Sequence, residues 1–395
     1  MTVAETVDTR AAARLPWTAL LALAAAGFLA IFTETIPAGL LPQLAEGLGV
    51  STSAAGQLVT LYAAGSVLAA IPLVAAVRRI SRKKVLLAAV GGLFVFNTVT
   101  ALAPWYPLIL VARFIAGAAA ALIWGVLAGY ARRLVVPALQ GRALAVTGIG
   151  QPIALAAGVP LGALAGSLVD WRWVFAAISA AAVLLAVWIA VSVPDVPGLA
   201  AGARTPLRRV VMLPGICAVL GAALLWVLAH NVLYTYIAPL LAPTGLRVDI
   251  GLAIFGLASF IGITLTGVVI DRALRATVLA ALGLMGAASA ALAWPASGAV
   301  IVAVVIAVWG LGFGGAPALL QTALADRAGE HTDAAQSVFV TVFNAAVAGG
   351  GLIGGAILLT GATAPALAWT AFGLVIAALV VTASRRTLPP GRRSD

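Results

Sequence analysis

Charged side chains are scarce in this sequence of 395 residues. Asp, Glu, Lys and Arg together make up 9% of it, whereas hydrophobic residues make up 63%. A soluble globular domain carries roughly 25% charged residues, which it needs to cover a surface that faces water. A chain this poor in charge is expected to use the lipid bilayer as its solvent. The shortage therefore excludes an ordinary water-soluble enzyme or binding domain.

The sequence also has only one cysteine and no nucleotide-binding motif. The one cysteine, Cys217, excludes an intramolecular disulfide, and its place in an apolar run predicts a small buried residue. No residue spacing fits a metal site, no GxxxxGK[ST] motif occurs, and no catalytic constellation is present. We therefore expect no metal, no cofactor and no enzymatic activity. Energy would then come from an ion gradient or from the gradient of the substrate.

Long apolar runs are what the sequence has in place of charge. A helix needs about 20 apolar residues to cross the hydrocarbon of a bilayer. The first run is too long for the core of a signal peptide, so we interpret it as an uncleaved span. The sequence predicts an all-α integral membrane protein. Its twelve spans are expected at approximately 17–41, 54–77, 85–103, 107–130, 142–168, 172–193, 211–241, 250–270, 276–294, 298–323, 334–360 and 363–383.

Basic residues give the chain a net charge of +11, but they form short clusters between apolar runs. No basic face interleaved with aromatic residues occurs, so we expect no nucleic-acid partner. With the N-terminus inside, the inner segments hold 20 of the 23 Lys and Arg residues, and the outer loops hold only Arg172 and Arg247. Under the positive-inside rule this places both termini in the cytoplasm.

The predicted chain has two halves. Residues 194–210 are rich in Pro, Gly and Arg, and they predict a cytoplasmic linker between an N-terminal half, 1–193, and a C-terminal half, 211–395. At an offset of 192 residues, Gly158 and Gly162 fall on Gly350 and Gly354. Parallel six-helix halves are typical of one class of secondary transporter.

Several motifs resemble one transporter family. The segment TETIPAGLLPQLAEGLGVSTSAAGQLVTLYAAG (33–65) resembles the first two helices of bacterial twelve-span drug:proton antiporters of the major facilitator superfamily. Within that family it is most similar to the branch of arabinose, sugar and purine-nucleoside efflux permeases. Further matching stretches are VARFIAGAAAALIWG (111–125), GVPLGALAG (158–166), WRWVF (171–175) and HNVLYTYIAPLL (230–241).

The resemblance implies the major facilitator fold, with two pseudo-symmetric six-helix bundles in the bacterial inner membrane. It also implies proton-driven efflux by alternating access between the halves. The sequence departs from the family in one loop, where VAAVRRISRKK (74–84) has Arg78 in the place of an acid. The equivalent loop of the second half, GVVIDRALR (267–275), keeps the acid as Asp271, followed by Arg272.

One acid and one base lie well inside the predicted spans, and both are expected at similar depth. Glu34 and Arg113 each lie roughly 10 Å from the outer boundary at ~1.5 Å per residue. A carboxyl group at such depth is a proton-relay candidate. Arg113 would hold Glu34 ionised when close and let it take up a proton when separated. The alternatives are a static pair and an arginine bonded to backbone carbonyls.

Other midspan residues are expected to line a substrate cavity. His230 is interpreted as a contact to substrate or to a polar network, as a proton carrier, or as a structural group. Asn97 is expected to join helices. The remaining cavity candidates are Asn231, Tyr234, Gln151, Asn344, Trp124 and Tyr62.

The fifth span carries a motif of small residues that we expect to be structural. Gly158, Gly162 and Gly166 recur every four residues and line one helix face without side chains, and Pro160 predicts a kink. Such a helix is suited to close packing and bending. The resemblance attaches this motif to antiporters.

Export of a drug-like or antibiotic-like small molecule by proton antiport is the leading functional hypothesis. The alternatives are efflux of sugars or purine nucleosides, and a proton-coupled uptake symporter. A membrane sensor or scaffold is disfavoured because no soluble domain is present. The expected partners are a small-molecule substrate, protons and the lipid bilayer, and the protein is expected to be a monomer.

Overall fold

The computed structural model describes residues 15–198, 210–294 and 298–383, and within these ranges all regular structure is helical. Within these described ranges, twelve helical stretches are long and apolar enough to cross a membrane, which confirms the number and the order of the predicted spans. The α-helices of the first six spans are α1 (Trp17–Gly39), α2 (Leu41–Leu48), α3 (Thr52–Ala76), α4 (Arg82–Leu102), α5 (Tyr106–Arg133), α6 (Gln140–Gly148), α7 (Gly150–Ile153), α8 (Val159–Leu168) and α9 (Trp171–Ser192).

The second set of six spans follows residue 210. Its α-helices are α11 (Ile216–Thr235), α12 (Ile237–Leu241), α13 (Val248–Leu292), α14 (Ala299–Gly314), α15 (Ala316–Ala328), α16 (Thr332–Leu359) and α17 (Ala364–Ala383). Helix α13 contains two spans, because its backbone breaks at Ala273, with φ −143° and ψ 36°. The tenth span is likewise made of α14 and α15, which meet at Gly315.

Side-chain caps explain several helix starts that the apolar runs alone do not fix. The hydroxyls of Ser51 and Ser81 accept bonds from the backbone N–H groups of Ala54 and Lys84, and the carboxylate of Asp170 accepts from Arg172. These bonds satisfy amides that have no partner inside the helix.

Two residues lie elsewhere than the sequence indicated. Arg172, which the charge count assigned to an outer loop, lies in the first turn of α9, because Asp170 caps that helix at Trp171. The guanidinium of Arg172 donates to the carbonyls of Ala101 and Ala103, both at 2.8 Å. Cys217 is exposed instead of buried. The prediction for Cys217 was wrong because a surface that faces lipid is as apolar as a protein core, so hydropathy does not distinguish the two.

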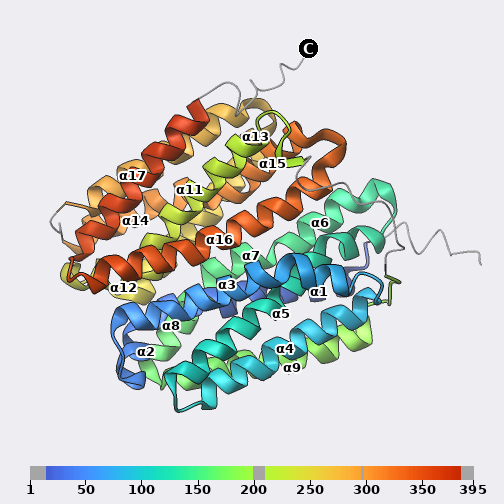
Figure 1. The fold of residues 1–395 in the computed structure, drawn as a ribbon, viewed down its shortest axis with the longest axis horizontal. Helices are drawn as coiled ribbons and strands as arrows, with labels where there is room; N and C mark the ends of the chain where they lie inside the picture. The colour runs from blue at the N-terminus through green and yellow to red at the C-terminus, as the bar shows by residue number, and fades with distance from the viewer. Residues whose placement is uncertain (1–14, 199–209, 295–297, 384–395) are drawn as a thin grey trace, which may run out of the picture.

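The helices lie in two groups, which Figure 1 shows one above the other. The N-terminal group contains α1 to α9, and the C-terminal group contains α11 to α17. Between the groups, α3 packs along α16, and α8 packs against α13. Part of the predicted linker, residues 199–209, lies outside the described residues, and the division of the chain into two folding halves remains a prediction.

One end of the molecule carries the start of α1 and the end of α17; we call the opposite end the distal end. Several side-chain hydrogen bonds join the two groups toward the distal end. Ser53 Oγ donates to the carbonyl of Gly355 at 2.8 Å, and the Gln57 amide lies 3.4 Å from both the Gly351 carbonyl and the Tyr236 hydroxyl. The two groups are therefore closed against each other at this end.

Candidate functional site

A proline in α1 determines how Arg113 is held. Pro37 lies inside α1 and has no N–H, so the carbonyl of Thr33, four residues earlier, lacks its helical donor. The Nη2 group of Arg113 donates to this carbonyl at 2.7 Å and lies 3.3 Å from the neighbouring carbonyl of Glu34. The guanidinium thus supplies the donor that the proline removes. Asn97 holds the same residue from α4, because its amide donates to Thr33 Oγ1 at 3.3 Å.

Close packing between α3 and α5 brings Arg113 to this position. A side chain at Gly65 would collide with the backbone of Phe114, and one at Gly117 would collide with the backbone of Tyr62, so both positions require glycine for this contact. Arg113 Nε then reaches the carbonyl of Leu58 on α3 at 3.2 Å.

Aromatic rings complete the surroundings of the guanidinium. The Tyr62 ring lies 4.6 Å from the guanidinium carbon of Arg113, and the Phe175 ring lies 5.8 Å from it, which are distances for cation–π attraction. The Tyr62 hydroxyl donates to the carbonyl of Ala30 at 3.0 Å. Tyr62 therefore packs against the arginine and braces α1 in this conformation.

The carboxyl group of Glu34 lies beside this network but is not bonded to it. Glu34 is buried, and no hydrogen bond or ion pair joins its carboxyl group to any of the described residues. Within the same part of the chain, Arg113 Nη1 is buried and also lacks a hydrogen-bond partner. The structure brings the predicted pair together through the backbone carbonyl of Glu34, so this carboxyl group is not held in a fixed ion pair.

The C-terminal group contains a cluster of aromatic rings around His230, which we call the ring cluster. The His230 ring stacks on Phe313 with centroids 3.5 Å apart, and it lies 5.1 Å from Tyr234 and 5.4 Å from Phe255 and Trp309. The side-chain amide of the neighbouring Asn231 donates a hydrogen bond to the carbonyl of Val227 on the same helix, at 2.9 Å. Of the predicted cavity residues, His230 and Tyr234 therefore meet in one place.

The remaining predicted cavity residues do not join a single site. Asn344 donates to the carbonyl of Val340 on its own helix at 2.9 Å. Gln151 and Trp124 are half-buried, and Trp124 packs against Gly27 of α1.

The small-residue motif of the fifth span, Gly158 to Gly166, packs closely against α1, as we expect of a helix face without side chains. A side chain at Gly158, Gly162 or Gly166 would meet α1, at Phe28, Ile36 and Leu40 respectively. Pro160 lies in the first turn of α8, directly after a π-helical turn at Ala154–Gly158. In the second-half segment GVVIDRALR (267–275), Arg272 is exposed, and the side chain of Asp271 lies outside what the structure describes.

The twelve-span helical fold agrees with what comparison with known proteins finds. Residues 23–351 match the family model of the Major Facilitator Superfamily. The chain belongs to this superfamily. The superfamily consists of transporters and not of enzymes, so the chain is a multi-pass membrane transporter of small molecules.

Relatives of this major facilitator chain cover its whole length. It is 30% identical to the purine ribonucleoside efflux pump NepI of Escherichia coli, over 96% of this chain and 97% of that protein. It is 29% identical to the transcription regulatory protein OpdE of Pseudomonas aeruginosa, over 95% of this chain and 96% of that protein. A crystal structure of a D-xylose-proton symporter shares the fold, with a TM-score of 0.76 at 13% identity over 96% of this chain and 99% of that one.

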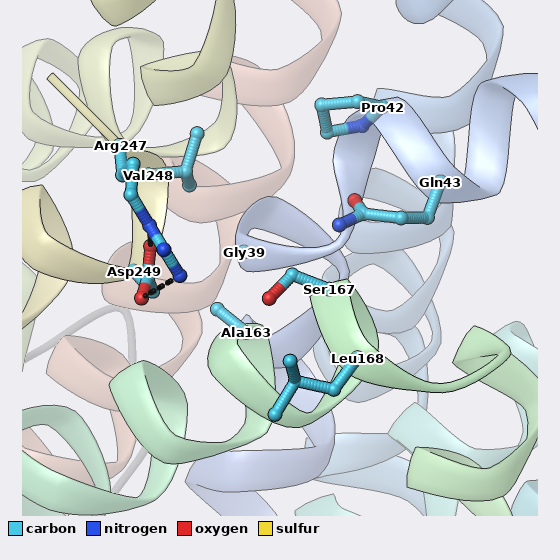
Figure 2. A pocket seen from close by; sticks show the side chains of 9 residues that line it. All are labelled: Gly39, Pro42, Gln43, Ala163, Ser167, Leu168, Arg247, Val248 and Asp249. Carbon is cyan, nitrogen blue, oxygen red and sulfur yellow. Dashed lines mark hydrogen bonds and ion pairs between the residues drawn. The ribbon is translucent and has the colours of Figure 1, made fainter.

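A hollow of about 320 Å³ lies between the two groups at the distal end of this major facilitator chain (Figure 2). Gln43 and Ser167 face it from the N-terminal group, and Arg247 and Asp249 face it from the C-terminal group. Arg247 and Asp249 form an ion pair at 2.9 Å, and the hydrogen bond to Asp249 raises the pKa of Arg247 above its ordinary value.

Sequence reasoning missed two parts of this site. It did not connect Pro37 with Arg113, although the proline marks a carbonyl that needs a donor from elsewhere. It also missed Phe255, Trp309 and Phe313, because aromatic residues in apolar spans look like ordinary packing until the fold brings their rings together around His230.

Proposed function

We propose that this protein exports a small organic molecule in exchange for protons, and that Glu34 carries the proton. The observation that supports this most directly is the state of Glu34: a buried carboxyl group well inside the hydrocarbon, without a fixed partner among the described residues. An intramembrane carboxyl group costs several kcal/mol unless it is protonated, paired or wet. A structural role would be served by a permanent bond, which Glu34 does not have.

Arg113 is the natural modulator of this carboxyl group. Its guanidinium is anchored to the backbone of α1 and α3 through three carbonyls, yet Nη1 has no partner among the described residues. A small rotation of α1 about Pro37 would move Glu34 toward Nη1 or away from it. Proton binding would therefore change with the conformation of α1, which is the coupling that an antiporter requires.

The closed distal end supports alternating access. The contact through Ser53, Gln57, Tyr236 and Gly355 holds the two groups together at that end, and a transporter must break such a contact to open there. We place the termini in the cytoplasm of a bacterial inner membrane on the basis of the Lys and Arg distribution. In that orientation this conformation is closed to the outside.

Efflux is favoured over uptake by the relatives named purine ribonucleoside efflux pumps. The same names favour a nucleoside over a sugar or a drug-like compound as the cargo. A proton-coupled uptake symporter would use the same carboxyl group, so the direction of transport needs its own test.

Transport into inverted membrane vesicles tests both coupling and direction. Vesicles with an inside-acidic gradient are given inosine, arabinose or a fluorescent drug-like amine. We expect the gradient to drive accumulation of one of these, and Glu34→Gln to abolish accumulation. The matched control is Glu46→Gln, since Glu46 is an exposed acid on α2. Unchanged gradient-driven accumulation by Glu34→Gln would refute the proposed role. Accumulation driven only by an inside-alkaline gradient, in which protons and solute enter together, would refute efflux by antiport.

A further inference from the structure

The ring cluster combines a packed aromatic wall with polar atoms that have no partner. Five side chains contribute to it: His230 and Tyr234 from α11, Phe255 from α13, and Trp309 and Phe313 from α14. All five are buried, and they lie on helices of the C-terminal group, whereas Glu34 lies on α1 of the N-terminal group.

Three polar atoms of the cluster are unsatisfied in the part of the chain that the structure describes. These are His230 Nδ1, the Tyr234 hydroxyl and Trp309 Nε1, and each is buried. Leaving one buried polar group without a partner costs about 1–3 kcal/mol. Native proteins keep such groups rare, so three of them on touching side chains indicate a place where a ligand or water supplies the missing bonds.

The stack of His230 on Phe313 is also unusual. The two rings are 3.5 Å apart between centroids and inclined by 6°, which is a nearly eclipsed sandwich. Aromatic pairs prefer offset or edge-to-face arrangements with centroids about 4.5–7 Å apart. The other contacts of the cluster, at 4.7–6.3 Å, lie in the preferred range.

One side of the ring cluster, at Phe255 and Trp309, is fully buried, and the other side, at His230 and Phe313, which we call the front, keeps a little exposed surface. Phe255 and Trp309 are 0% exposed, whereas His230 and Phe313 are each 6% exposed. Phe313 precedes Gly314 and Gly315, where α14 ends, so it lies at a break in the tenth span. It is therefore the ring at the front of the cluster that is best placed to swing away.

We propose that the ring cluster binds a flat, uncharged nitrogen heterocycle, which takes the place of Phe313 on the face of His230. The heterocycle stacks on the imidazole, and its edge atoms bond with the Tyr234 hydroxyl and Trp309 Nε1. Phe313 fills this place when the transporter is empty. The assignment rests on the proposed transport function, for which it names the class of substrate.

Equilibrium binding to purified protein in lipid nanodiscs tests the assignment, with inosine as the flat probe and arabinose as the non-aromatic one. We expect inosine to bind and arabinose not to compete. Trp309→Leu should weaken inosine binding by about tenfold, because it removes both an edge donor and part of the aromatic wall. Phe313→Leu should tighten it severalfold, because leucine fills the space but stacks poorly.

Matched controls are Phe260→Leu and Trp173→Leu, since both side chains are exposed on the outer surface of the helices. A circular dichroism spectrum and a monodisperse elution profile establish that each variant is folded. Inosine binding that is unchanged in Trp309→Leu, or weakened in Phe313→Leu, would overturn the assignment. So would binding of arabinose in place of inosine.

This experiment is separable from the test of proton-driven export, because equilibrium binding needs no gradient. Gradient-driven export of arabinose that depends on Glu34, together with no binding of inosine, would overturn the ring site and leave the transport function intact. Binding of inosine that depends on Trp309, without gradient-driven movement, would overturn the transport function and leave the ring site.

Discussion

Removing the guanidinium of Arg113 is expected to destabilise the protein less when Pro37 is also replaced by alanine. In the wild type, Arg113 Nη2 is the donor that reaches the Thr33 carbonyl, because Pro37 has no N–H to offer. Arg113→Met keeps an apolar side chain in the space but leaves that carbonyl bare. In the Pro37→Ala background, the amide of residue 37 can bond to Thr33 as in an ordinary helix.

The magnitude follows from the carbonyls that Arg113 contacts. Those of Glu34 and Leu58 lie in regular helix and retain their own amide donors, so they lose little. The Thr33 carbonyl loses its partner, which costs about 1–3 kcal/mol when the group is buried. The effect on Glu34 of losing the positive charge occurs in both backgrounds and cancels in a double-mutant cycle. The expected coupling free energy is therefore about 1–3 kcal/mol.

Unfolding in mixed micelles with increasing SDS, followed by circular dichroism, measures the free energy of unfolding of all four proteins in the cycle. Pro72→Ala is the matched control, because Pro72 also lies inside a helix but is far from Arg113 along α3. Free energies that add within about 0.5 kcal/mol for Arg113→Met and Pro37→Ala would refute the bond-replacement account.

Three further predictions concern the distal end. Gly56→Val should prevent closure of the distal end, because a side chain there collides with Tyr236, whereas the control Gly91→Val has free space around it. The readout is the rate at which a maleimide labels a Thr60→Cys probe in a Cys217→Ser background. Labelling should be about tenfold faster with Gly56→Val than with Gly91→Val, and equal rates would contradict the closure. Tyr236→Phe removes a hydroxyl that lies 3.4 Å from both the Gln57 amide and the Ser53 carbonyl of the N-terminal group, and should therefore speed the same labelling about fivefold; an unaltered rate would contradict this role of the hydroxyl. Asp249→Asn should lower the pKa of Arg247 toward its ordinary value without changing its charge at neutral pH, so the unfolding midpoint should stay the same. A clear shift would assign this pair, in which the arginine is exposed and the aspartate half-buried, a structural role.

The number of spans could be predicted from the sequence because each span is long, apolar and separated from the next by charges or prolines. Helix ends were less predictable, as Arg172 illustrates, because one capping carboxylate decides whether a turn is helical. Exposure was unpredictable for Cys217, since lipid and protein interior are equally apolar solvents for a side chain.

The candidate site was predictable in its residues but not in its bonds. Glu34 and Arg113 stand out in the sequence because charge is expensive in hydrocarbon, and their similar depth follows from helix rise. The contact of Arg113 with the Thr33 carbonyl depends on the rotation of α1 against α5, which sequence spacing does not encode. The ring cluster joins α11, α13 and α14 over some 80 residues of sequence, so its shared polar edges become visible only in the fold.

Proton flux through the purified protein tests the central claim most directly. Proteoliposomes that contain a trapped pH-sensitive dye are given the exported solute on one side, in the absence of any other gradient. We expect solute movement through the wild type to drive protons the opposite way. Glu34→Gln should carry no protons but should still exchange labelled for unlabelled solute across the membrane. Solute-driven proton movement of normal size in Glu34→Gln would contradict the account.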